Sequence, residues 1–179
     1  KLTFESLLYA LLVGSGNDAA YTLAEDYPGG IKNFIETMNV KGRSLGLNGT
    51  NFTNVVGIDT FEHQTTAHDL AVLTVEALKN PLISQAVAKD KIEIFDIGGK
   101  NSYLLESTNK LLGQVFGVKG VKTGWTESAG ECLVAYTQRE KGEIVTVVLG
   151  SSDRFGETRA LIEWIYQNFQ WQPISATRQ

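Results

Sequence analysis

The residues Lys122-Thr123-Gly124 carry the clearest chemical potential in this sequence: a cation, a hydroxyl and a residue without a Cβ. On a β-strand, Lys122 and Gly124 would share one face while Thr123 takes the other. The glycine would let a ligand lie against the strand edge. By itself, the triplet indicates no more than a strand that runs into a turn.

A second polar stretch, Ser15-Gly16-Asn17, stands far upstream and changes that interpretation. A serine hydroxyl can relay a proton, and an asparagine amide can both donate and accept hydrogen bonds, which suits holding a peptide group. A serine-asparagine motif and a K-T-G motif, together with an S-x-x-K motif, form one constellation for serine acyl transfer. Taken alone, Ser15 and Asn17 are equally explained as helix caps.

Hydrophobic periodicity puts these motifs in a chain with helices at the front and strands at the back. Ser15 and Asn17 fall in the tight connection between two predicted helices, where Asn17 or Asp18 is the expected N-cap, and Lys122 falls at the end of a predicted strand. The other predicted helices cover residues 31 to between 42 and 46, 67–78, 82–88 and 156–169; the predicted strands cover 91–97, 102–105, 118–123, 131–139 and 143–149.

These elements predict an α/β fold of the α+β kind, with a helical cluster beside an antiparallel sheet and its covering helix. Residues 47–64 have no clear period and predict a long ordered loop. The chain enters a helical pattern almost at once, which suggests a piece of a longer protein with a fold incomplete at the N-terminus. We expect residues 1–171 to form one partial domain and residues 172–179 to begin a linker.

Composition excludes several classes of protein. A net charge of −4 without a block of Lys and Arg argues against a nucleic-acid partner. The longest apolar run is too short to span a bilayer. The single cysteine, Cys132, cannot form an internal disulfide, which fits a reduced compartment and an exported bacterial protein equally well. Two histidines, His63 and His68, are too few for a histidine-rich metal site, so surface or capping roles and no metal or cofactor are expected.

At this point the residues resemble a known family, the D-alanyl-D-alanine carboxypeptidases, which are low-molecular-mass penicillin-binding serine peptidases. The similarity runs in order through nearly the whole chain, over residues 15–20, 34–57, 65–71, 109–112, 117–126 and 129–135. The resemblance implies a β-lactamase/transpeptidase-like fold and hydrolysis of the bond between two D-alanines through an acyl-serine intermediate.

The resemblance also implies roles for the motif residues. Ser15 would pass a proton to the leaving amine, and Asn17 would hold a substrate peptide group. Lys122 would hold Ser15 and add positive potential near the substrate carboxylate. Thr123 would hydrogen-bond that carboxylate, Gly124 would make room for the substrate, and the backbone N–H of Trp125 would be one oxyanion donor. The Trp125 side chain would either wall the cleft or simply pack.

Some residues near the motifs remain undecided or are set aside. A family arginine binds the terminal carboxylate, and either Arg154 or Arg159 could correspond to it. Glu76 faintly resembles a deacylating glutamate, but it falls inside a helical pattern and we reject that role. The one S-x-x-K, Ser107 to Lys110, lies between the other two motifs, whereas the family nucleophile precedes them. We interpret it as a chance match, and we expect this chain alone to lack the nucleophile and to be inactive.

Three hypotheses follow from the sequence. The first is a serine D-Ala-D-Ala carboxypeptidase, the second a β-lactamase, and the third a non-catalytic peptidoglycan-binding homologue. The resemblance implies two partners, a peptidoglycan stem peptide ending in D-Ala-D-Ala and β-lactam antibiotics. It implies a location outside the cytoplasm, in the periplasm or on the outer face of the bacterial cytoplasmic membrane. Missing first strands would leave a sheet edge free, and such an edge could pair two copies.

Overall fold

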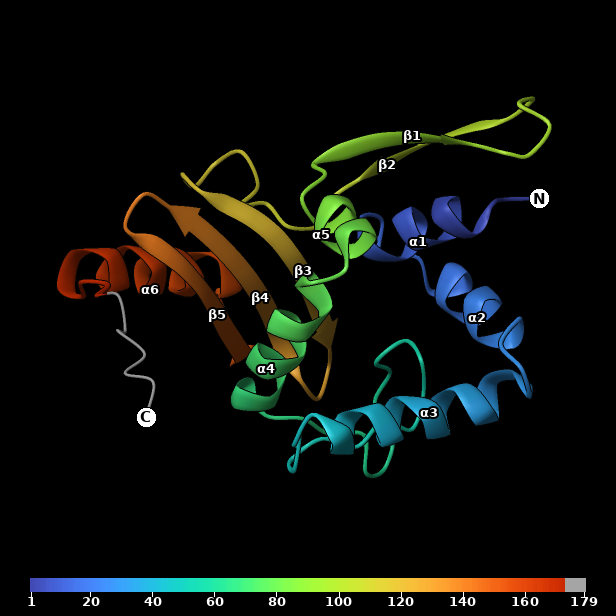
Figure 1. Cartoon of the computed structure of the whole chain (residues 1–179), viewed down its shortest axis with the longest axis horizontal. Coiled ribbons are helices and arrows are strands. Elements are labelled where there is room, and N and C mark those ends of the chain that lie inside the picture. The colour runs from blue at the N-terminus through green and yellow to red at the C-terminus, as the bar shows by residue number, and fades with distance from the viewer. Residues whose placement is uncertain (173–179) are drawn as a thin grey trace, which may run out of the picture.

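The structure is a computed structural model that describes residues 1–172. The predicted linker residues 173–179 lie outside the described residues. Within residues 1–172 the chain has a sheet with its own covering helix on one side and a helical cluster on the other (Figure 1). The two motifs come from opposite sides of this arrangement. No helix of the described part is long and apolar enough to cross a membrane.

The helical cluster begins with α1 (Phe4–Leu12), α2 (Asn17–Glu25) and α3 (Gly30–Ser44). The Thr3 hydroxyl accepts from the Ser6 backbone N–H and caps α1, as predicted. A sharp turn then leads into α2, whose alanines are buried. The apolar side chains of α1 are only partly covered, since no residue of that helix is fully buried. The connection between α1 and α2 covers only residues 13–16, and it holds Ser15 close to both helices.

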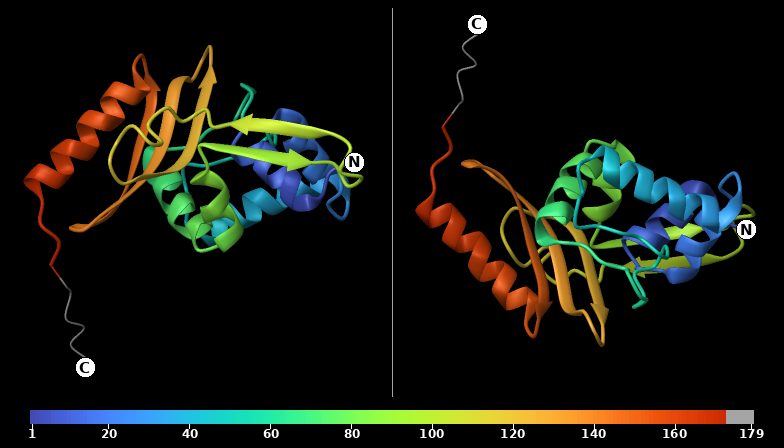
Figure 2. Two further views of the ribbon diagram at one scale, coloured as in Figure 1. Left: turned by 90° about the horizontal axis from the view of Figure 1, so that it is seen from above. Right: turned by 90° about the horizontal axis from the view of Figure 1, so that it is seen from below.

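The sheet that carries the K-T-G motif is an antiparallel meander of β3 (Val118–Thr126), β4 (Gly130–Arg139) and β5 (Gly142–Ser151). The predicted meander is confirmed. Helix α6 (Arg154–Asn168) covers one face of this sheet (Figure 2). The core between them is formed by Leu111, Val115, Val118, Leu133, Ala135, Ile162 and Tyr166. At about 25 cal/mol per Å² of buried apolar surface, such a cluster is the main source of stability for this side.

On the opposite face of the sheet lie α4 (Ala67–Leu78) and α5 (Pro81–Val87). Helix α4 is capped by Thr66, which accepts from the Asp69 N–H, and α5 starts with proline after the Asn80 cap. A separate hairpin of β1 (Lys91–Phe95) and β2 (Ser102–Glu106) lies beside α1. The α+β prediction is therefore confirmed, with the sheet between α6 and α4.

Three local predictions need correction. Strand β3 continues past Gly124 to Thr126, so the K-T-G motif lies inside the strand and not at its end. The reason is its register with β4, which pairs Trp125 with Glu131 and keeps the ladder intact. The N-cap of α2 is Gly16 rather than Asn17 or Asp18. Helix α6 begins at Arg154, before the predicted start, because Asp153 caps it by accepting from Gly156.

Candidate active site

The fold brings the two motifs into direct contact. The Lys122 ammonium donates a hydrogen bond to the Ser15 hydroxyl oxygen at 2.5 Å and another to the Thr123 carbonyl at 2.9 Å. The Ser15 residue comes from the α1–α2 turn, while Lys122 comes from the middle of β3. A hydroxyl and an amine at this distance can exchange a proton directly.

Ser15 adopts a backbone conformation that non-glycine residues rarely take, with φ at 55°. The Gly16 N–H donates to the Ala10 carbonyl, which closes the turn at the end of α1. A Cβ on Gly16 would lie 3.2 Å from that carbonyl oxygen, so the turn is tight on both sides. Strain of this kind costs about 1–3 kcal/mol and is found where a side chain must point in one direction. Here it turns the Ser15 hydroxyl toward Lys122.

A cavity of about 470 Å³ opens at this contact. One wall is the strand, from Lys122 to Thr126, and the facing wall is a loop, from Val55 to Ile58. Asn17 also lines the cavity and is exposed. Because Gly16 takes the cap position of α2, the Asn17 side chain is not used as a cap and faces the cavity. The structure therefore brings together all six residues that the sequence singled out: Ser15, Asn17, Lys122, Thr123, Gly124 and Trp125.

The Lys122 side chain is largely buried, and this lowers its pKa from 10.5 to about 8. Burial is the main cause, and the nearby positive charge of Arg154 adds to it. A lysine with this pKa is still mostly charged at neutral pH but releases its proton readily. It can therefore hold the Ser15 oxygen as a donor and also supply or take a proton.

Arg154, and not Arg159, lies at the site. Its guanidinium donates to the Gly124 carbonyl at 2.8 Å, and its backbone N–H donates to a Glu131 carboxylate oxygen at 3.1 Å. The Nε atom of Arg154 is buried and has no hydrogen-bond partner within residues 1–172. Arg159 is exposed further along α6. The sequence left this choice open, because it depends on how α6 leaves the sheet.

Thr123 lines the cavity, but its hydroxyl is already engaged. It shares a hydrogen bond with the hydroxyl of Thr108 at 2.6 Å, and the residue is 9% exposed. A hydroxyl can accept while it donates, so Thr108 can donate to Thr123 and leave the Thr123 proton for a ligand. Thr108 lies within the S-x-x-K match, which sequence reasoning set aside. Thr108 acts on the site through its hydrogen bond to Thr123.

The serine and the lysine of that S-x-x-K match lie elsewhere. The Ser107 hydroxyl accepts from the Asn109 backbone N–H, and the Lys110 ammonium lies 5.9 Å from the centre of the Phe155 ring. Neither residue lines the cavity. The interpretation of this motif as a chance match to the nucleophile is therefore supported by its position.

Trp125 lines the cavity with 66% of its surface exposed, so simple packing does not explain it. At Gly124 an added Cβ would lie 3.7 Å from the Cβ of Cys132 on the neighbouring strand, which is an ordinary contact, so within residues 1–172 the glycine is not required by packing. The sequence did not predict the facing loop wall. Its only signal was the run of Asn, Thr and Gly residues in 47–64, which indicates order but not location.

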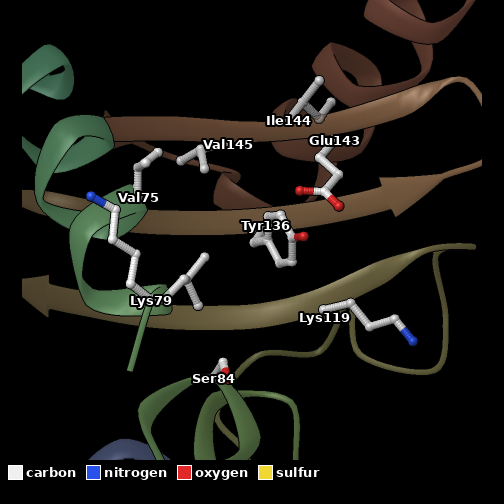
Figure 3. Close-up of a pocket in the computed structure, with 9 residues that line it drawn as sticks. Val75, Lys79, Ser84, Lys119, Tyr136, Glu143, Ile144 and Val145 are labelled. Carbon is white, nitrogen blue, oxygen red and sulfur yellow. The ribbon is translucent and has the colours of Figure 1, made fainter. Parts of the chain in front are cut away.

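A second hollow of about 560 Å³ lies on the same face of the sheet, between α4, α5 and the strands (Figure 3). Tyr136 lies at its centre, and burial together with the Glu143 carboxylate raises the pKa of Tyr136 to about 12. Lys79 and Lys119 lie at its rim. None of the motif residues lines this hollow, so the smaller cavity is the candidate active site.

Comparison with known proteins agrees with this geometry. A sequence model of the D-alanyl-D-alanine carboxypeptidase family matches residues 1–153. The D-alanyl-D-alanine carboxypeptidase DacF of Bacillus subtilis is 29% identical over 97% of this chain and 45% of its own length. The chain spans about half the length of the curated relatives it matches.

Solved structures give the same result. The DD-transpeptidase of Streptomyces K15 superposes with a TM-score of 0.85 at 30% identity, over 91% of this chain and 67% of that one. Penicillin-binding protein D2 of Listeria monocytogenes, in its ampicillin-bound form, superposes with a TM-score of 0.81 at 30% identity, over 90% and 67%. The fold is that of the penicillin-binding and DD-transpeptidase proteins. Within that class, the chain belongs to the D-alanyl-D-alanine carboxypeptidase family.

Proposed function

We propose that this chain is part of a serine-type D-Ala-D-Ala carboxypeptidase, which removes the terminal D-alanine from peptidoglycan stem peptides. The observation that carries the proposal is the 2.5 Å contact between Lys122 and Ser15, with Arg154 beside them. A hydroxyl paired to a lysine of lowered pKa serves proton transfer, and two cations next to a strand edge suit a peptide that ends in a carboxylate.

In this mechanism the substrate lies along β3 beside Gly124, with its terminal carboxylate near Arg154 and the Thr123 hydroxyl. Asn17 holds a peptide group of the substrate through its amide. The backbone N–H of Trp125 donates to the oxyanion that forms when the carbonyl is attacked. Ser15, held by Lys122, passes a proton to the leaving D-alanine amine. Each role stays a proposal that rests on position in the cavity.

The nucleophilic serine and its lysine belong, in this proposal, to an S-x-x-K segment outside residues 1–179. The single S-x-x-K of the chain supports this, because Ser107 and Lys110 do not line the cavity. Attack on the carbonyl would give an acyl-serine, and water would then hydrolyse it. The chain alone is expected neither to bind penicillin covalently nor to hydrolyse peptides. The division into a domain over residues 1–171 and a following linker also stays a prediction.

The test is intact mass after incubation with a penicillin, on the full-length gene product and on this chain in parallel. The expected result is a stable adduct on the full-length product alone, together with release of D-alanine from a peptide ending in D-Ala-D-Ala. An adduct on this chain, mapped to Ser107 or Ser15, would contradict the assigned roles. Absence of an adduct on both would favour a non-catalytic peptidoglycan-binding homologue, and rapid turnover of penicillin would favour a β-lactamase.

The similar DD-transpeptidase of Streptomyces K15 marks a further alternative, in which an amine rather than water accepts the acyl group. The ampicillin-bound relative from Listeria monocytogenes supports β-lactams as ligands of this site. We propose a location outside the cytoplasm, where peptidoglycan is found. Strand β5 lies at the edge of the described sheet, so pairing of two copies along it stays a prediction that light scattering can test.

A further inference from the structure

The loop wall of the cavity belongs to a segment with an unusual number of internal hydrogen bonds. This segment, residues 51–64, is called the strap from here on. It runs in teal between α3 and α4, on the side of the helical cluster that faces the sheet (Figure 1). Its two ends pair with each other, since the backbone groups of Asn51 and Gln64 exchange two hydrogen bonds at 2.9 and 3.1 Å. The strap is therefore a closed loop.

The base of the strap is fixed to a helix. The Asn39 side chain in α3 donates to the Phe52 carbonyl at 2.7 Å and accepts from the Phe52 N–H at 2.8 Å. The tip is fixed to the sheet. The Asp59 carboxylate accepts from the Thr126 hydroxyl at 2.7 Å and from the Ser128 N–H at 3.3 Å. The strap thus bridges the helical cluster and the end of the K-T-G strand.

Inside the strap, a turn around Asn54 forms the cavity wall itself. The Asn54 side-chain oxygen accepts from the backbone N–H groups of Val56, Gly57 and Ile58 at 2.7–3.2 Å. The Asn54 amide nitrogen donates to the Ile58 carbonyl at 2.8 Å. Val56 to Ile58 line the cavity opposite Lys122, so the shape of this turn sets the width of the substrate space.

His63 holds the inner side of that turn. Its Nδ1 accepts from the Thr53 backbone N–H at 3.1 Å and lies 3.2 Å from the Thr53 hydroxyl and 3.4 Å from the Asn54 side-chain nitrogen. The ring packs edge-on against Phe52. A backbone N–H can only donate, so Nδ1 must be the unprotonated ring nitrogen. A proton on Nδ1 would set two donors against each other and break this contact.

We propose that the strap is a positioning element for the proposed reaction, and that His63 is the residue that fixes the cavity wall while Asp59 latches it to the K-T-G strand. This proposal rests on the proposed function for its effect on substrate, and on the contacts above for its structure. The sequence predicted a surface or capping role for His63, whereas the imidazole is partly buried and accepts from the turn.

The same contact makes the strap sensitive to acid. Burial lowers the pKa of His63 below its ordinary value of 6.5, and the negative charge of Asp59 opposes this in part. Within residues 1–172, Asp59 is the one charged side chain that acts on this pKa. An opened strap, with His63 near its ordinary pKa, binds a proton more readily than the closed strap. The closed strap is therefore fully favoured above about pH 6.5 and is lost as the pH falls below it.

Backbone hydrogen exchange on this chain tests the proposal without any turnover. In His63→Phe, which keeps a ring but removes the acceptor, the amide of Thr53 is expected to exchange at least about tenfold faster, relative to its intrinsic rate. His63→Asn places an oxygen close to the Nδ1 position and cannot be protonated, so it should restore protection. His68→Asn is the control, because the His68 side chain is 82% exposed.

The pH dependence of amide protection is a second readout, and it would not change if His63 had only a packing role. Protection of the Thr53 amide should fall between pH 7.5 and 5.5 in the wild-type chain and stay level in His63→Asn. Asp59→Ala should loosen residues 56–58, while Glu127→Ala, which removes an exposed carboxylate from the β3–β4 turn that Asp59 binds, should not. Unchanged Thr53 protection in His63→Phe, or the same pH dependence in wild type and His63→Asn, would overturn the proposal.

Acylation by a β-lactam in the full-length gene product links the strap to the reaction. In His63→Phe, the β-lactam concentration that gives half the maximal rate of acylation should rise several-fold, while the maximal rate stays nearly unchanged. His63→Asn should be close to wild type in both. Equal concentration dependence in all variants would refute the effect on substrate. If the amide readouts hold but no adduct forms on the wild type, the proposed function fails while the structural role of His63 stands.

Discussion

The two walls of the cavity are built by different means. The strand wall, from Lys122 to Thr126, is part of a backbone ladder and is backed by the buried side chains under α6. The loop wall, from Val55 to Ile58, has no ladder and is held by the side chains of Asn54, Asp59 and His63. The position of a group on a strand is fixed by the whole sheet, whereas the position of a group on this loop is fixed only by side-chain hydrogen bonds.

The two walls supply different kinds of groups to the candidate site. The groups that we propose to exchange protons or bind charge come from well-fixed parts of the backbone: Lys122 from β3, Arg154 from the start of α6 and Ser15 from a strained turn. The groups that shape the space come from the loop. Changes in the strand wall should therefore act on chemistry or on global stability, and changes in the loop wall should act locally.

The largest effect is expected for Lys122→Met in the full-length gene product. Removal of the amine leaves Ser15 without its proton partner, so the rate of acylation by penicillin should fall at least about a hundredfold. Intact-mass kinetics measure this rate. Lys119→Met is the matched control, because Lys119 is exposed on the same strand. A similar loss in both variants would mean that the effect is not specific to the Ser15 contact.

Substitution in the core behind the strand wall should destabilise the sheet and the site together. Leu133 is fully buried between β4 and α6, so Leu133→Ala should lower the free energy of unfolding by about 2–5 kcal/mol. Urea denaturation of the chain measures this loss. Gln138→Ala, at an exposed position of the same strand, should change it by less than about 0.5 kcal/mol. A small loss for Leu133→Ala would show that the strand wall does not depend on this core.

The buried amine should also oppose folding, although it serves the reaction. A pKa of Lys122 lowered from 10.5 to about 8 corresponds to a destabilisation of the folded chain by about 3 kcal/mol at most. This destabilisation is present while Lys122 is protonated in the folded chain. Between pH 8 and 10.5 the unfolded chain binds a proton that the folded chain has released, so stability should rise with pH. Urea denaturation across this range should give that slope in the wild type and a reduced one in Lys122→Met. Equal slopes in the two proteins would refute the lowered pKa.

A smaller effect is expected where charge binds the substrate. Arg154→Lys shortens the side chain and loses the planar guanidinium that contacts the Gly124 carbonyl, so KM for a peptide ending in D-Ala-D-Ala should rise about tenfold, with less change in kcat. Steady-state release of D-alanine by the full-length gene product measures both constants. Arg159→Lys should leave both unchanged. A higher KM in Arg159→Lys alone would reverse the choice between the two arginines.

The strand wall was predictable from the sequence, and the loop wall was not. The alternation of Val121-Lys122-Thr123-Gly124 and the glycines around Ser15 have local causes, so pattern and motif identified both stretches. The length of β3 was underestimated because its register depends on β4. The choice between Arg154 and Arg159 depended on the Asp153 cap. The contacts of His63 and Asp59 join residues that no periodicity connects, so only a folded chain reveals them.

The smallest effect is expected at the base of the strap. Asn39→Ala leaves the Phe52 N–H and carbonyl without partners, at about 1 kcal/mol per hydrogen bond, and this energy holds the loop rather than the whole fold. Amides in 52–58 should exchange about tenfold faster while β3 amides keep their protection. Asn33→Ala is the control, since Asn33 lies on the same helix and its side chain donates to the Pro28 carbonyl, outside the strap. Faster exchange in β3 as well would mean that the two walls are one cooperative unit, and the division of work between them would then be wrong.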